Sequence, residues 1–314
     1  MACMAFERRF SGGFEIVGEM TSGEAYDPQF QVTYRTAASI LAHAEYPKAR
    51  LAYLDSLLAL YGDNVFLNRL LMEGARTVIF AVAICLDAGF REEDRDSWPT
   101  IGNLKKALAA FGLASPRRIE QVVSRLIQTG YLETRVSPRD ARVRLLAPTA
   151  KMLAHDQEWL ISHYRPLAIL FGDERYARPL ARDPAFQRVQ RGVACDFFVQ
   201  SAMVLLRNPD IMLFLARDAG ILVLVRLVRA TITAGSQTVP LSLAELARSC
   251  SISRTHVRQL LSDAQAQGLV EIGHAARQIT ILPRTLQSLD QFIADGMSNH
   301  DRTGAAALRA LGSD

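Results

Sequence analysis

The chain has 314 residues, of which 49% are hydrophobic and 22% are charged, and its net charge of +4 accompanies a pI near 9.0. A chain of this length can form two domains of ordinary size, and its composition excludes a disordered protein. The mildly basic balance permits a nucleic-acid partner but does not indicate one by itself.

The sequence predicts no metal site, no disulfide framework and no cofactor. Its four cysteines, at positions 3, 85, 195 and 250, are far apart, and no Cys-x-x-Cys pair or Cys/His cluster occurs. The chain also has no Gly-x-Ser-x-Gly motif, no phosphate-binding loop and no His-Glu-x-x-His motif. We therefore expect a protein that is not an enzyme.

The sequence predicts no membrane partner. The most apolar segments, over 78–86 and 221–228, are too short to span a bilayer, and charged residues flank or interrupt them. The N-terminus carries charge where a secretory signal needs an apolar run. We therefore expect a cytoplasmic protein.

Apolar periodicity predicts helices along most of the chain. One helix is expected from Thr36 to about Leu60, and one long helix from Val65 to about Leu86. Another long helix is expected to begin at Ile211 and to end near Gly235. The regions expected along the chain are an N-terminal arm over 1–35, a helical region over 36–97, a first winged-helix module over 98–155, a linker with long helices over 156–236, a second module over 237–285, and a C-terminal helix and tail over 286–314.

The stretch from Ser115 to Glu133 has the pattern of a DNA-reading helix. Ser115 can cap the helix and Pro116 suits its first position. Apolar residues then recur at helical spacing on one face, and Gly130 is placed to end the helix. A helix over 101–111 and a short turn precede this stretch, which is the helix-turn-helix order.

A hairpin with an arginine-rich tip is expected after this helix. Its strands are predicted at 131–136 and 142–146, with a turn between them. Four arginines lie in or beside the tip: Arg135, Arg139, Arg142 and Arg144. A helix-turn-helix followed by such a hairpin is typical of a winged helix that binds DNA.

The same pattern returns 138 positions later, from Ser253 to Glu271. The cap, the apolar face and the terminating glycine all align without a gap, with Gly268 in the place of Gly130. A second hairpin is expected from Leu269 to Leu282. A single amphipathic helix would carry little weight, whereas two copies in one register indicate an internal repeat.

The first module resembles the MarR family of bacterial transcription regulators over about fifty residues. The carrying residues are the helix-turn-helix, the Asp140-x-Arg142 pair at the hairpin tip, and the exit Leu145-Leu146-Ala147-Pro148-Thr149. The chain departs from the family in having Pro148 there and no glycine after Thr149, and its second module lacks Asp-x-Arg.

The resemblance implies that Asp140 orders the hairpin and that Arg142 reaches toward a minor groove. It also implies a dimer, which one chain with two modules would imitate, with further homodimerisation possible. A small-molecule effector of unknown identity, bound between the long helices and a winged helix, is a further implication.

The expected DNA contacts come from both modules. They are Ser115, Arg117, Arg118, Gln121, Ser124, Arg125, Arg139, Arg142, Arg144, Arg254, Thr255, His256, Arg258, Gln259 and Arg277. The second set is expected to bind more loosely, because Asp263 stands where the first helix has Arg125 and would repel phosphate.

The sequence therefore predicts a mainly α fold in which two winged helix-turn-helix modules, joined by long helices, are related by a pseudo-two-fold. The predicted function is a sequence-specific regulator of transcription that binds double-stranded DNA, in the manner of a repressor and with a possible response to a ligand. Two alternatives remain open: a scaffold that uses winged helices for protein contacts, and a plasmid-type replication initiator.

Overall fold

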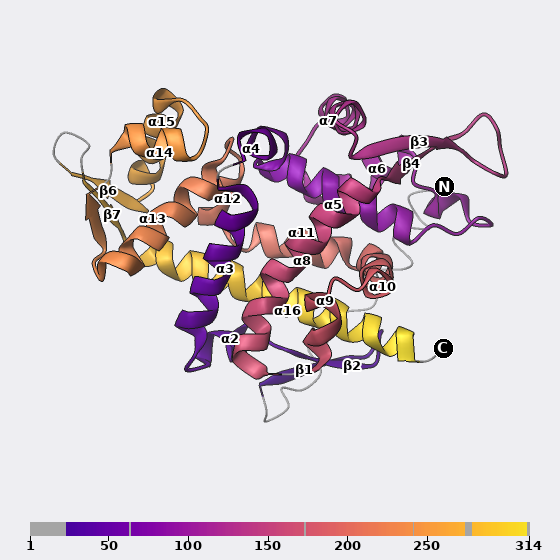
Figure 1. The fold of residues 1–314 in the computed structure, drawn as a ribbon, viewed down its shortest axis with the longest axis horizontal. Coiled ribbons are helices and arrows are strands. Elements are labelled where there is room, and N and C mark those ends of the chain that lie inside the picture. Colours follow the sequence, from indigo (N-terminus) through magenta and orange to yellow (C-terminus); the bar gives the residue numbers. More distant parts are fainter. Residues whose placement is uncertain (1–22, 63, 173, 241, 274–277, 313–314) are drawn as a thin grey trace.

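The computed structural model describes residues 23–312 except 63, 173, 241 and 274–277. It is mainly helical, with small antiparallel sheets (Figure 1). The elements of the N-terminal half are β1 (Glu24–Asp27), β2 (Val32–Arg35), α2 (Ala37–Ala42), α3 (Tyr46–Tyr61), α4 (Val65–Leu71), α5 (Gly74–Ala88), η1 (Arg95–Ser97), α6 (Ile101–Leu108), η2 (Ala109–Phe111), α7 (Pro116–Gln128), β3 (Leu132–Val136), β4 (Arg144–Pro148) and α8 (Ala150–Phe171).

The C-terminal half continues with η3 (Glu174–Tyr176), α9 (Ala177–Leu180), α10 (Pro184–Ala194), η4 (Cys195–Phe197), α11 (Phe198–Leu206), α12 (Pro209–Leu215), α13 (Gly220–Ala234), β5 (Thr238–Pro240), α14 (Leu243–Ser249), α15 (Arg254–Ala266), β6 (Val270–Ile272), β7 (Gln278–Ile281) and α16 (Pro283–Gly312). Two short helices, η3 and α9, lie between α8 and α10, and η4 separates α10 from α11.

The described part of the N-terminal arm is an ordered hairpin. Strands β1 and β2 pair antiparallel and lie on α16. The backbone N–H of Arg35 donates to Oδ2 of Asp301 at 2.7 Å, and Asp27 pairs with Arg302 at 2.5 Å. The first strands and the last helix are therefore joined, although they lie at opposite ends of the chain.

The expected long helix from Val65 to Leu86 was wrong, because the chain forms α4 and α5 with a break at Met72 and Glu73. The carbonyl of Met72 accepts the backbone N–H of Ala219 at 2.6 Å instead of continuing the helix. The second expected long helix is also split, into α12 and α13, and Ala219 in that break has a φ of 51°. A backbone hydrogen bond holds the two breaks against each other, and the spacing of apolar residues in the sequence cannot reveal it.

Gly220 shows how closely the second break is packed. A Cβ atom at this position would lie 2.2 Å from the carbonyl oxygen of Phe214. Only glycine can therefore begin α13 at this point.

Two segments share the order helix, helix, hairpin. The first comprises α6, α7 and the β3–β4 pair, and the second comprises α14, α15 and the β6–β7 pair, to which β5 adds a third strand. We call these segments the first unit (101–148) and the second unit (243–281). Figure 1 shows them at opposite ends of the same edge of the molecule, with α4 between them.

The outer helices of the two units, α7 and α15, each have 13 residues and begin 138 positions apart, as the sequence predicts. The hydroxyl of Ser115 accepts the N–H of Arg118, and that of Ser253 accepts the N–H of His256. Gly130 and Gly268 follow these helices with φ values of 74° and 69°. Local capping and the left-handed glycine therefore set both helix ends.

A continuous apolar core joins the two units to the helices beneath them. Helix α3 packs on α8 and α13, whereas α10 packs on α16 and α5. The first unit packs on α5 and, through η2, on α11, whereas the second unit packs on α13.

Candidate nucleic-acid interface

Helix α7 presents a polar face to solvent. Its apolar residues Ile119, Val122 and Leu126 are buried, so the opposite side must face outward. Four of the predicted contact residues are exposed there: Arg117, Gln121, Ser124 and Arg125. Within the described part of the chain, no carboxylate pairs with Arg117 or Arg125, so their guanidinium groups are available to an anionic partner.

Two residues at the start of α7 have structural partners. Ser115 is exposed, but its hydroxyl serves as the cap of the helix. The guanidinium of Arg118 lies 3.6 Å from the carboxylate of Glu73, in the break between α4 and α5. Arg118 therefore also ties the first unit to the body of the protein.

Strand pairing brings the arginines of the first hairpin to one end of the unit, but not all of them are free. Arg139 pairs with Glu92 at 3.0 Å and with Glu93 at 3.3 Å. Because these carboxylates come from the charged connector before α6, the sequence did not show that they would neutralise Arg139. Arg142 and Arg144 are exposed and have no acidic partner among the described residues.

Asp140 orders the turn of this hairpin. Its Oδ1 accepts the backbone N–H of Arg142 at 3.2 Å, and its Oδ2 accepts a hydrogen bond from Arg95 at 3.0 Å. A short Asx-type bond of this kind favours a turn over an extended strand. The Asp-x-Arg pair thus holds Arg142 at the exposed tip.

Helix α15 is exposed at Arg254, Thr255 and Arg258. His256 is half-buried, and its Nε2 atom is inaccessible to solvent. Burial lowers the pKa of this imidazole, and the charge of Arg217 lowers it further. His256 therefore directs its Nε2 atom away from solvent.

Asp263 is not the free repulsive charge that its sequence position suggests. Its carboxylate pairs with Arg217 at 2.7 Å and accepts a hydrogen bond from Gln259 at 2.8 Å. The side chain of Gln259 is exposed but already bonded within the helix. Arg277, the expected contact of the second hairpin, lies outside the described residues.

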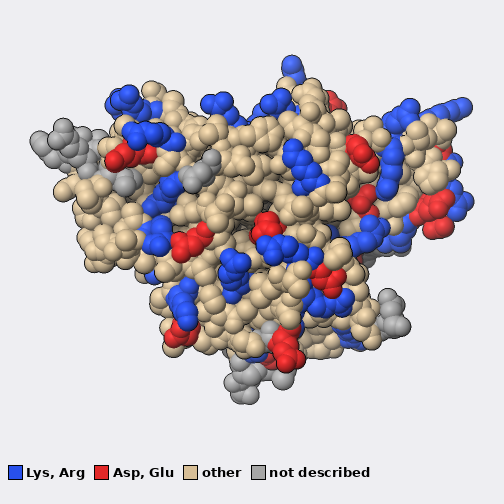
Figure 2. Space-filling view, viewed as in Figure 1, with Lys and Arg blue, Asp and Glu red and all other residues tan. Residues whose placement is uncertain are grey.

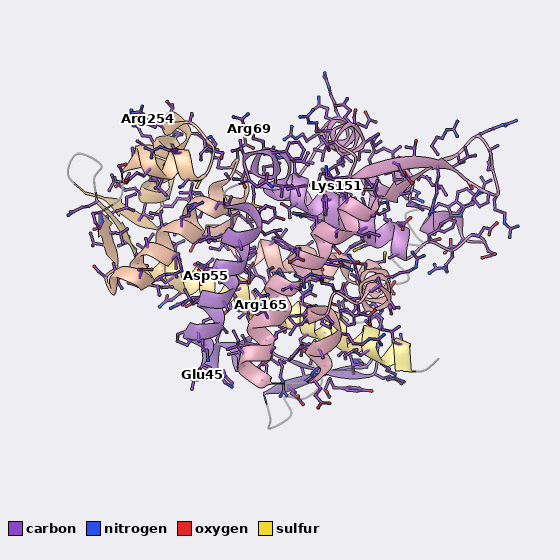
Figure 3. The ribbon with its side chains drawn as sticks, in the orientation of Figure 1. Glu45, Asp55, Arg69, Lys151, Arg165 and Arg254 are labelled. Carbon is purple, nitrogen blue, oxygen red and sulfur yellow. The ribbon has the colours of Figure 1, made fainter. Side chains whose placement is uncertain are left out.

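A basic residue missed by the sequence analysis lies between the two units. Arg69 of α4 is exposed, and Figure 3 shows it on the same edge as Arg254 of α15. Figure 2 shows further Lys and Arg side chains along this edge, over α15, around α4 and over the first hairpin. No motif surrounds Arg69, so only the position of α4 between the units reveals it.

The two helix breaks below this edge contain a series of linked ion pairs. Glu73 pairs with Arg76 at 3.1 Å as well as with Arg118, and Arg76 also pairs with Asp218 in the second break. These pairs connect α7 to the break between α12 and α13. The two units are therefore joined electrostatically as well as by the core.

An interior cavity of about 220 Å³ lies between the long helices and the first unit. Its lining includes Phe111 and Leu113 beside the first unit and Tyr61 of α3, whose hydroxyl lies 2.9 Å from Nε2 of His155. The buried ion pair of Asp156 and Arg191, with an O···N distance of 2.5 Å, closes one side. The cavity occupies the region where an effector was expected.

Among the described residues, no group of three or more His, Cys, Asp or Glu side chains could hold a metal ion. None of the helices described is both long and apolar enough to cross a membrane. No family model, curated protein or solved structure matches the chain. Function must therefore be inferred from the geometry of the edge formed by α7, α4 and α15.

Proposed function

We propose that the chain is a sequence-specific regulator that binds double-stranded DNA through two winged helices. The observation that carries this proposal is the pair of capped helices of equal length, α7 and α15, whose polar faces lie on one basic edge (Figure 2). A helix of this kind, followed by a hairpin, can place its first turn in a major groove and its hairpin beside the backbone. The proposal assigns no reaction to the chain.

The packing of the long helices supports a pseudo-two-fold relation between the halves. Helices α4 and α12 have seven residues each, and α5 and α13 have 15 each. The contacts exchange as a two-fold requires: α3 of the first half packs on α13, and α10 of the second half packs on α5. One chain would then present two DNA-reading helices as a symmetric homodimer does.

In this proposal Arg117 and Arg125 meet base edges and phosphates, and Arg142 enters or borders a groove. The MarR-type resemblance of the first unit supports these roles, as does the order that Asp140 imposes on the hairpin tip. Occupation of a promoter by such a protein would exclude polymerase, so we favour repression over activation. The interior cavity is the proposed place for an effector.

The proposal is tested by selecting sites from genomic or random duplexes with the purified chain. A specific site should bind with a Kd in the usual range of about 10⁻⁸ to 10⁻¹¹ M, and affinity should fall steeply with salt because counterions are released. The footprint should cover two half-sites. An affinity that is equal for all duplexes would contradict sequence-specific regulation.

A protein-interaction scaffold is the second candidate, and one observation favours it. Val65 and Phe66 of α4 are 47% and 43% exposed. Apolar side chains on an otherwise polar edge are typical of protein contacts. This candidate predicts a response to salt that is nearly flat, which separates it from DNA binding. A plasmid-type initiator would instead bind repeated sites at a replication origin.

A further inference from the structure

A second hollow of the molecule, distinct from the interior cavity, lies between α4 and the second unit. It is a cleft of about 740 Å³. Its walls come from α4, from the break between α12 and α13, and from the turn that leads from α14 into α15. Pockets of about 300 to 1,000 Å³ accommodate ligands the size of common metabolites.

The floor of this cleft contains a polar group without a partner. Asn68 is only 2% exposed, and neither its Nδ2 nor its Oδ1 has a hydrogen-bond partner among the described residues. An unpaired buried amide costs about 1–3 kcal/mol, so proteins rarely keep one without a purpose. The residue of α12 that corresponds to Asn68, 144 positions later, is Met212. An apolar side chain therefore occupies the equivalent position in the second half of the chain.

The rim of the cleft is basic. Three arginines line it, Arg69, Arg76 and Arg248, against the single carboxylate of Asp218, which is paired with Arg76. Arg69 and Arg248 are exposed and form no salt bridge within the described chain, although the charge of Arg248 helps to lower the pKa of Glu245. Both guanidinium groups are therefore available to an anion at the mouth of the cleft.

The start of α15 adds donors to the same wall. Ser253, its N-cap, lines the cleft and accepts the backbone N–H of His256, while the N–H groups of Arg254 and Thr255 have no partner within the helix. Such a helix end favours a phosphate or carboxylate. His256, whose buried Nε2 has no partner among the described residues, lines the cleft one turn further along.

We propose that this cleft binds an adenine nucleoside monophosphate, with the base edge on Asn68 and the phosphate between Arg69, Arg248 and the start of α15. An asparagine amide matches the adjacent donor and acceptor of adenine, N6 and N7, because it donates through Nδ2 and accepts through Oδ1. Guanine presents two acceptors at that edge and fits less well. A duplex would offer the same phosphate chemistry, but its backbone would meet only the rim and not the buried amide.

The inference goes beyond DNA binding and does not depend on it. Isothermal titration of the full chain with AMP, in the absence of DNA, should show one site. Adenosine and inorganic phosphate should each bind more weakly than AMP, and GMP should bind at least tenfold more weakly. If no heat of binding is detected for AMP, the proposal is wrong.

Asn68→Leu isolates the role of the amide. Leucine is similar in volume and leaves no unpaired polar atom, so the variant should unfold at the same or a higher temperature. Its affinity for AMP should fall at least tenfold, while inorganic phosphate binds as before. Unchanged AMP affinity in a folded Asn68→Leu variant would overturn the proposal.

Arg248→Ala tests the phosphate subsite and Arg254→Ala is its matched control. Both arginines are exposed in the second unit, but only Arg248 lines the cleft. We expect weaker binding of both AMP and inorganic phosphate for Arg248→Ala and no change for Arg254→Ala. If Arg248→Ala and Asn68→Leu weaken duplex binding but leave AMP binding intact, the cleft is part of a DNA surface and not a nucleotide site.

Discussion

The first and second units have the same backbone pattern but different chemistry. Helices α7 and α15 share length, serine cap and terminating glycine. At matched positions, however, Arg117 becomes Thr255, and Arg125 becomes Asp263. The turn before each helix also differs, since a left-handed conformation is taken by Gly112 in one unit and by Ser251 in the other. Backbone signals therefore persist where side-chain charges have diverged.

The ion pairs beneath the two units have opposite polarity: the helix carries the positive member in one unit and the negative member in the other. In the first unit, Arg118 on the helix pairs with Glu73 in the break below. In the second, Asp263 on the helix pairs with Arg217 in the break below. Each helix is tied to the break below it by one ion pair, but among the described residues only the first helix has unpaired arginines on both sides of that pair. In the proposed complex we therefore expect the first unit to read bases and the second to make mainly sequence-independent contacts that position the protein on the duplex.

Acidification should first destabilise the helices that support both units. His163 of α8 and His300 of α16 lie with ring centroids 4.1 Å apart, where these helices meet. Burial lowers the pKa of His163 to about 4, and burial, His163 and Arg191 lower that of His300. Since these two histidines bind fewer protons in the folded chain than in the unfolded chain below pH 6.5, their contribution to stability should be lost as pH falls from about 6.5 toward 4.

The loss should approach about 1.4 kcal/mol per pH unit for each proton taken up on unfolding. Denaturant titrations between pH 8 and pH 4.5 would measure it. His163→Gln should flatten the profile because it removes one titrating group. A free energy of unfolding that is constant over this range would contradict neutral histidines at this contact.

Arg117→Ala should have the largest effect on recognition. A bidentate arginine–guanine contact is worth about 1–3 kcal/mol, which corresponds to a loss of about five- to 150-fold and to relaxed specificity in one half-site. Thr255→Ala, at the matched position of α15, should change affinity little. Fluorescence-anisotropy titrations with the intact site and with scrambled duplexes make the comparison, and equal losses in both variants would remove the proposed asymmetry.

Arg142→Ala should weaken binding to all duplexes by a similar, smaller factor. Its guanidinium has no acidic partner among the described residues, and in the proposed complex it would meet the backbone or a groove without reading one base. The slope of log affinity against log salt should become shallower by about one, because one fewer counterion is released. Arg139→Ala is the control: because Arg139 is paired with Glu92 and Glu93, its loss should matter less.

Asp263→Ala should have the smallest effect and the opposite sign. It removes a carboxylate from the second helix and leaves Arg217 without that partner. Binding to nonspecific duplexes should tighten a few-fold at low salt, and this gain should disappear as salt screens the charges. A loss of affinity would mean that the Asp263–Arg217 pair matters more for the position of α15 than for repulsion of the DNA phosphates.

The sequence by itself determined the local structure of both units. Serine caps, apolar spacing and terminating glycines act over three or four residues, so they predict where α7 and α15 begin and, to within two residues, where they end. The same reasoning anticipated both hairpins. It also indicated the repeat, because these signals recur in one register.

Only the tertiary structure decided which of the predicted contact residues are free. Arg139 meets carboxylates 46 and 47 positions away in sequence, and His256 turns inward beside a break in another pair of helices. The breaks near Met72 and Ala219 were missed because a backbone bond between them replaces helical bonds that periodicity favours. Asn68 reads in sequence as one polar residue among apolar ones, and only the tertiary structure buries its amide without a partner among the described residues.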